Sequence, residues 1–128
     1  MGILKRLFKS GAPKEEKVLP WIPLTSVKQL EEIQKRSIIR TQVILKYSTR
    51  CGVSRMVLNQ FTEHYDLNDG EHDLYFLDLL SYREVSNQVM YTFQVMHQSP
   101  QLLVIKNGAV VAHASHGGIN SIDLSDYI

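Results

Sequence analysis

The sequence predicts an α/β protein built on a central four-stranded mixed sheet with an additional N-terminal helix. Two short apolar runs, 41–47 and 74–79, are each followed by apolar residues at helical spacing. The last two apolar runs, 101–106 and 109–114, flank Asn107-Gly108. A strand, helix, strand order implies a right-handed parallel crossover, and Asn-Gly between apolar runs indicates a tight antiparallel hairpin. Parallel and antiparallel pairs are therefore expected in one sheet.

Capping residues and apolar spacing place the helices. Ser26 and Gln29 form the pattern of a capping box before Leu30 and Ile33, and Ser81 and Glu84 repeat that pattern before Val85, Val89 and Phe93. The expected order is a helix from Ser26 to about Lys35, the strand at 41–47, a helix from Gly52 to a loop at 65–70, the strand at 74–79, a helix from Ser81 to about Phe93, the hairpin at 101–114, and a short closing helix within 119–128.

Composition and length favour one globular domain. The chain has 128 residues, of which 44% are hydrophobic, which is enough for one packed core. We expect residues 1–20 to form a basic, amphipathic arm and linker, and residues 21–128 to form the domain. Residues 1–17 carry five basic and two acidic side chains, a local charge of +3 within a total of +1.

The arm also bears on possible partners. Residues 1–9 place Ile3, Leu4, Leu7 and Phe8 on one face of a short helix, which fits a peripheral contact with a membrane surface or a protein; the alternative is an arm that packs on its own domain or frays. No basic stripe with interleaved aromatic residues follows, so nucleic acid is not expected as a partner. No apolar run is long enough to predict a membrane span.

The single cysteine, Cys51, lies where an apolar strand gives way to a helix. Free N–H groups and the dipole at a helix start stabilise a thiolate, and Arg50 adds a nearby positive charge. The alternative is a small buried hydrophobe, but the polar flanks indicate an exposed turn. One cysteine excludes a disulfide framework within the chain, so a reducing cytoplasm is the expected location. Ser54 stands where dithiol oxidoreductases carry their second cysteine.

Three segments together resemble a known family. They are Thr49-Arg50-Cys51-Gly52-Val53-Ser54-Arg55, His97-Gln98-Ser99-Pro100-Gln101 and His113-Ala114-Ser115-His116. In this order, on these elements, they resemble the monothiol bacilliredoxins (YtxJ-like proteins of the bacillithiol system) within the thioredoxin-like fold, over about residues 26–128. A second relative is the monothiol glutaredoxin, whose Cys-Gly-Phe-Ser motif differs here at Val53. Family members often carry proline where this chain has Gly52.

The resemblance implies a thiol–disulfide oxidoreductase in which Cys51 removes bacillithiol, or another low-molecular-weight thiol, from S-thiolated proteins. No tightly bound cofactor is expected, because the small thiol is a cosubstrate. The proline before the third large strand, Pro100, is expected to be cis and to present Ser99 to an extended substrate backbone. The thiolate-stabilising residues are then Thr49, Arg50, Gly52 and Ser54, and the substrate-binding residues are Ser99, Pro100, Gln101, His116 and Gly117.

Other functions stay open from sequence alone. One is a carrier that shares an iron–sulfur cluster between two subunits through Cys51, although the aromatic residue of the glutaredoxin motif is missing. Another is a redox-inert binding module. His113 and His116 invite a metal site, but no carboxylate or second cysteine completes four ligands, so none is expected. His97 lies near Pro100 in the sequence and is equally consistent with a residue that borders the small-thiol pocket and with a surface histidine. Asp73 is expected to be a solvated charge.

Overall fold

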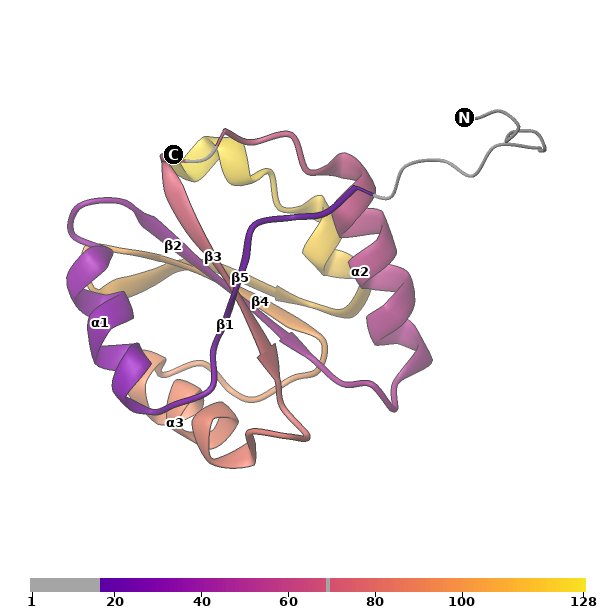
Figure 1. Ribbon diagram of the computed structural model, residues 1–128, viewed down its shortest axis with the longest axis horizontal. Coiled ribbons are helices and arrows are strands. Elements are labelled where there is room, and N and C mark those ends of the chain that lie inside the picture. The colour runs from indigo at the N-terminus through magenta and orange to yellow at the C-terminus, as the bar shows by residue number, and fades with distance from the viewer. Residues whose placement is uncertain (1–16, 69) are drawn as a thin grey trace, which may run out of the picture.

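A mixed five-stranded sheet lies between helices on both of its faces (Figure 1). The computed structural model describes residues 17–68 and 70–128. The helices and strands are β1 (Trp21–Pro23), α1 (Lys28–Arg36), β2 (Thr41–Tyr47), α2 (Gly52–His64), β3 (His72–Asp78), α3 (Arg83–Phe93), β4 (Gln101–Lys106), β5 (Ala109–Ser115) and the 3-10 helices η1 (His116–Ser121) and η2 (Leu124–Tyr127).

The strands lie in the order β1-β3-β2-β4-β5. Strand β3 is parallel to both β1 and β2, whereas β4 is antiparallel to both β2 and β5. The hairpin between β4 and β5 turns at Asn107 and Gly108, whose φ values of 53° and 81° are those of the type I′ turn expected from Asn-Gly. The mixed sheet and the βα order of the sequence prediction are therefore confirmed.

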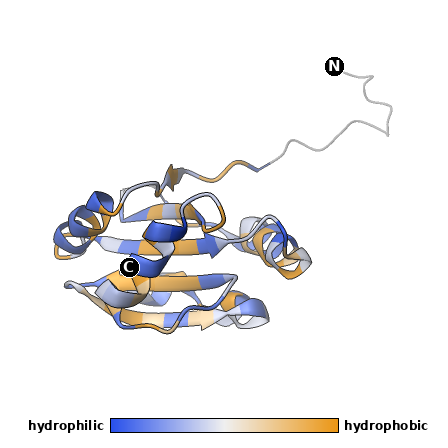
Figure 2. Cartoon of the chain, turned by 90° about the horizontal axis from the view of Figure 1, so that it is seen from below, coloured by the Kyte–Doolittle hydropathy of each residue, from blue (hydrophilic) through white to orange (hydrophobic). Residues whose placement is uncertain are grey.

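Alternate residues of the central strands build two separate cores. Ile44 of β2 and Leu103 of β4 face α1 and α3, while the neighbouring Leu45 and Leu102 face α2 and the C-terminal 3-10 helices. All four side chains are at most 1% exposed. Figure 2 shows the apolar residues concentrated in the strands, with helices of mixed polarity beside them. Burial on both faces explains why these strands are continuous apolar runs.

The two predicted capping boxes have different outcomes. At α1, the side-chain oxygen of Gln29 accepts hydrogen bonds from the backbone N–H groups of Ser26 and Thr25, at 3.0 and 2.8 Å. At α3, the prediction is wrong: no side chain caps the helix at Tyr82, and the Ser81 hydroxyl instead donates to the Asp78 carboxylate at 3.0 Å. Asp78 lies at the end of β3, close enough for its carboxylate to accept the hydrogen bond of the Ser81 hydroxyl, so this hydroxyl does not cap the helix.

Three further features differ from the expected architecture. The sheet has a fifth strand, β1, whose three residues are too short to give an alternating pattern. The closing segment forms two short 3-10 helices instead of one helix. Leu19 is only 6% exposed within the α2-side core, so packing begins before the domain boundary placed at residue 21. The arm contact predicted for residues 1–9 lies outside the described residues.

Asp73 is not the solvated charge that the sequence indicated. Its side chain is buried at the start of β3, where it accepts hydrogen bonds from Arg36 Nε at 2.8 Å and from Gln42 Nε2 at 2.7 Å, with Arg40 Nε 3.6 Å away. Burial opposes its ionisation, but these bonds outweigh burial and lower the pKa of Asp73. Among the described helices, none has the length and hydropathy needed to cross a bilayer.

Candidate active site

Cys51 occupies the N-cap position of α2, four residues after the end of β2. The buried strand delivers the chain to the polar residues Ser48, Thr49 and Arg50, and the helix then begins at Gly52 because its Val57 and Phe61 bury against the sheet. Cys51 has extended backbone angles, φ −105° and ψ 116°. It is partly exposed, so its sulfur is open to reagents from solvent.

Hydrogen bonds at the helix start lower the pKa of the Cys51 thiol. The backbone N–H of Ser54 makes the largest contribution, and the N–H of Val53 and the Ser54 hydroxyl add to it against a smaller opposing effect of burial. Ser54 is fully buried, and its Oγ also accepts from the N–H of Ser48 at 3.4 Å, which fixes the hydroxyl beside the thiol. These donors stabilise the thiolate more than the thiol.

The four predicted thiolate-stabilising residues differ in their relation to the Cys51 thiol. Ser54 lowers the pKa of the Cys51 thiol through its N–H and its hydroxyl, and its N–H also donates to the Cys51 carbonyl at 3.1 Å. Thr49 and Arg50 are exposed and are not among the groups that lower the pKa of Cys51. Gly52 is the first residue of α2 and has open space where a Cβ would lie. Sequence reasoning missed the N–H of Val53, although a residue two positions after an N-cap normally carries a free N–H.

The predicted substrate-binding segment begins just before β4, the strand that pairs with β2. The Ser99–Pro100 peptide bond is cis, and the Pro100 carbonyl accepts from the N–H of His116 at 3.0 Å. His116 and Gly117 are exposed beside it, at the start of η1. The Ser99 hydroxyl is buried without a hydrogen-bond partner among the described residues.

Gln101 is a correction, because its side chain does not reach a substrate surface. It is 2% exposed, accepts from Lys46 Nζ at 3.0 Å, and donates to the Met96 carbonyl at 2.9 Å. Lys46 also lies 2.8 Å from Nδ1 of His97, and its own side chain is fully buried. The sequence signal for Lys46 was a single lysine within an apolar run expected to be buried on both faces.

The strand register brings the Cys51 and Pro100 segments to one edge of the sheet, formed by the end of β2 and the start of β4. Lys46 of β2 pairs with Gln101 of β4, and Tyr47 of β2 pairs with Asp78 of β3. The end of β2, which leads to Cys51, therefore lies beside the start of β4, which follows Pro100. This edge holds the candidate active site.

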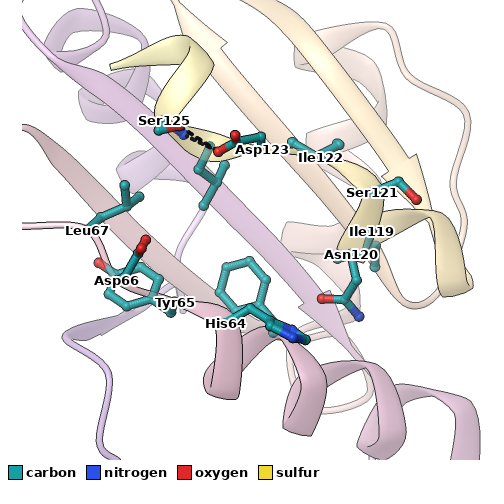
Figure 3. A pocket seen from close by; sticks show the side chains of 12 residues that line it. His64, Tyr65, Asp66, Leu67, Ile119, Asn120, Ser121, Ile122, Asp123 and Ser125 are labelled. Carbon is teal, nitrogen blue, oxygen red and sulfur yellow. Dashed lines mark hydrogen bonds between the residues drawn. The ribbon is translucent and has the colours of Figure 1, made fainter.

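A cavity of the described chain lies away from the candidate site. Its volume is about 240 Å³, and it is formed by the C-terminal end of α2, the loop after it, and residues of η1 and η2 (Figure 3). Phe61, His64 and Tyr65 line one side, and Asn120 and Asp123 line the other. None of the predicted site residues lines this cavity, since Cys51 is at the opposite end of α2. The candidate site is thus separate from this cavity.

Metal ligands do not gather within residues 17–68 and 70–128. No group of three or more His, Cys, Asp or Glu side chains there is placed to hold a metal ion. His113 and His116 are both exposed.

Comparison with known proteins agrees with this geometry. A solved structure described as a candidate oxidoreductase with a thioredoxin fold has 29% identity and a TM-score of 0.69, and the match covers 84% of this chain and 92% of the other. Schistosoma mansoni thioredoxin pre-protein has 18% identity, a TM-score of 0.60 and coverages of 84% and 98%. Malassezia sympodialis thioredoxin has 19% identity, a TM-score of 0.59 and coverages of 81% and 81%. The two thioredoxins are distant enough to support the fold alone.

The family match is more specific than the fold. The family described as monothiol bacilliredoxin BrxC matches residues 22–124, which include Cys51, the Ser99–Pro100 segment and His116. The chain therefore belongs to the monothiol bacilliredoxin BrxC family and has the thioredoxin fold.

Proposed function

We propose that this protein is a monothiol thiol–disulfide oxidoreductase that uses Cys51 to remove bacillithiol, or another low-molecular-weight thiol, from S-thiolated proteins. The observation that carries the proposal is the position of Cys51, a partly exposed thiol at the start of α2 whose pKa is lowered by the N–H groups of Ser54 and Val53. The thiolate is the reactive form in disulfide exchange.

The reaction proceeds by two exchanges of a disulfide bond. The Cys51 thiolate attacks the sulfur of the small thiol in the modified protein. The disulfide between small thiol and protein breaks, the protein cysteine leaves as a thiolate, and a disulfide between Cys51 and the small thiol forms. Because the chain has only one cysteine, a second molecule of small thiol resolves this intermediate. It releases the Cys51 thiolate and a disulfide of two small thiols.

The hydrogen bonds around Cys51 favour the second exchange in particular. A lowered pKa increases the thiolate fraction but reduces the intrinsic nucleophilicity of the sulfur, so the two effects partly cancel in the attack step. The same bonds make Cys51 a better leaving group, which speeds its release from the mixed disulfide. The site thus suits transient acceptance of a small thiol.

The remaining parts of the proposal concern binding and location. Ser99, Pro100, His116 and Gly117 would contact the thiol-bearing substrate, with the backbone beside Pro100 pairing with an extended chain. The small thiol would act as a cosubstrate without any tightly bound cofactor. A lone thiol of lowered pKa fits the reducing cytoplasm, where small thiols keep cysteines reduced.

Transfer of the adduct tests the proposal. Reduced protein is mixed with a bacillithiol-modified protein, and intact-mass spectrometry follows loss of the modification from the substrate and its appearance on Cys51. Cys51→Ser is the matched control, because it exchanges only sulfur for oxygen. We expect transfer by the wild-type protein and none by the variant. An unmodified Cys51 beside an unchanged substrate would overturn the proposal.

A further inference from the structure

Lys46 is a buried cation that takes part in none of the ion pairs of the described residues. Its side chain is fully buried on the sheet face that packs against α1 and α3, and its hydrogen-bond partners within the described part of the chain are Gln101 Oε1 and His97 Nδ1, at 3.0 and 2.8 Å from Nζ. The ion pairs of the described residues involve Asp73 with Arg36 and Arg40, at the other end of the sheet. A buried charge held only by neutral acceptors leaves a positive potential around it.

The contact with Lys46 determines how His97 carries its proton. An ammonium group has hydrogens to donate and no lone pair, so Nδ1 of His97 is the acceptor. A neutral imidazole then has its hydrogen on Nε2. Burial, Lys46 and Arg83 together lower the pKa of His97 and keep it neutral at physiological pH. His97 is otherwise exposed, so its Nε2–H is a donor available to a ligand.

A second cation acts on the same imidazole. Arg83, the first residue of α3, is close enough to His97 to contribute to its lowered pKa, and no acidic group contributes in the opposite direction. The N-terminus of α3 has no side-chain cap. The two carboxylates nearest to Arg83 in the sequence are those of Asp78, which accepts from Ser81, and of Glu84, which is exposed in the first turn of α3. Two cations, Lys46 and Arg83, therefore act on the His97 imidazole.

We propose that the Nε2–H of His97 and the guanidinium of Arg83 bind a carboxylate of the low-molecular-weight thiol, with Lys46 as the positioning residue that orients His97. A carboxylate there would accept from a neutral donor and also balance the charge of Lys46 through the imidazole. This inference rests on the proposed function, because it assigns the cosubstrate an anionic group.

The position of His97 relative to the thiol supports this assignment. Lys46 is five residues before Cys51 and pairs with Gln101, the residue after Pro100. His97 therefore lies on the loop that leads to Pro100, tied at this sheet edge by the same ammonium group. In the proposed complex the sulfur of the small thiol meets Cys51 and its carboxylate is directed toward His97 and Arg83.

Two small disulfides, one neutral and one anionic, test the subsite. Reduced protein is treated with hydroxyethyl disulfide, which is neutral, or with dithiodipropionate, which is anionic. In each case the Cys51 thiolate attacks one sulfur, forms a mixed disulfide and releases the other half as a thiolate. Intact-mass spectrometry gives the rate of adduct formation. Each rate is divided by that of a free model thiol, which removes differences in intrinsic disulfide reactivity.

The variants separate the subsite from general charge effects. His97→Asn keeps an oxygen that can accept from Lys46 but lacks the Nε2–H, and Arg83→Gln removes the second cation. Lys35→Gln is the control, because it removes one exposed positive charge from α1. We expect the wild-type protein and Lys35→Gln to prefer the anionic disulfide by about fivefold, the upper range for an exposed ionic contact, and both subsite variants to lose that preference.

The outcomes distinguish this inference from the function on which it rests. Equal normalised rates in the wild-type protein, or an anion preference that persists in both subsite variants, would overturn the carboxylate subsite while leaving the oxidoreductase proposal intact. If neither disulfide formed an adduct with wild-type Cys51, the oxidoreductase proposal itself would fail.

Discussion

Replacing Lys46 by Met should change how the stability of the protein depends on pH. Burial lowers the pKa of Lys46 from 10.5 to about 8. The protonated form is therefore disfavoured in the folded state, and this destabilisation is fully present below about pH 8 and is relieved as the pH rises toward 10.5. Because the pKa of Lys46 is 10.5 in the unfolded state and about 8 in the folded state, proton linkage raises the free energy of unfolding by about 2 kcal/mol between about pH 7.5 and pH 9.5.

Urea unfolding at several pH values in this window measures the effect. Lys46→Met should lack the gain of about 2 kcal/mol, whereas Lys35→Met, which removes an exposed lysine, should keep it. The difference between variant and wild type is the readout, because titrating groups away from Lys46 contribute equally to both, and His97, whose pKa is lowered from 6.5, is neutral in this window. Loss of the bonds to Gln101 and His97 shifts the stability of Lys46→Met by a constant amount. Parallel pH profiles for wild type and Lys46→Met would refute the reasoning.

Three other substitutions have defined outcomes. Ser54→Ala removes the hydroxyl beside Cys51 but keeps the backbone donor, so the pH profile of Cys51 alkylation should move to higher pH without losing the whole shift. Gly52→Pro should raise the free energy of unfolding by about 0.5–1 kcal/mol in urea titrations, because the site is a helix start with free space. Asp73→Asn should cost about 1–3 kcal/mol above pH 5 and progressively less as the pH falls below 3.8, since the depressed pKa of Asp73 supplies stability that is lost as its carboxylate is protonated.

Each of these has a contrary result. An unchanged alkylation profile in Ser54→Ala would mean that the hydroxyl does not act on the sulfur. The extended φ and ψ of Cys51 are compatible with a following proline, so a large loss of stability in Gly52→Pro would contradict the geometry of the helix start. A cost of Asp73→Asn that did not change between pH 5 and pH 3 would show that ionisation of the carboxylate contributes nothing.

The sequence predicted those parts of the fold that have strong local signals. Burial on both faces made β2 and β3 continuous apolar runs, and Asn107-Gly108 marked the hairpin. Strand β1 escaped because three residues cannot display a period, and its assignment depends entirely on pairing with β3. The absent cap at Ser81 has the same origin: Asp78 comes near it only once β3 has formed.

The candidate site divides in the same way. The position of Cys51 and the contact from Ser54 were predictable, because both depend on neighbours within one helical turn. The role assigned to Gln101 was wrong, since its partner Lys46 is 55 residues away in the sequence and is brought close by the pairing of β2 with β4. Local patterns identify a reactive atom, but only tertiary structure determines which nearby side chains remain free for a ligand.

This division predicts that reactivity and selectivity of Cys51 respond to different substitutions. The groups that lower its pKa belong to α2, whereas His97 and Arg83 act from the far side of the sheet edge and do not contribute to that pKa. His97→Asn should therefore leave the pH profile of alkylation by iodoacetamide, a neutral reagent, unchanged while abolishing the preference for an anionic disulfide. Ser54→Ala should do the reverse. If either variant altered both measurements, the thiolate and the carboxylate subsite would not be independent, and the assignment of His97 to binding alone would have to be abandoned.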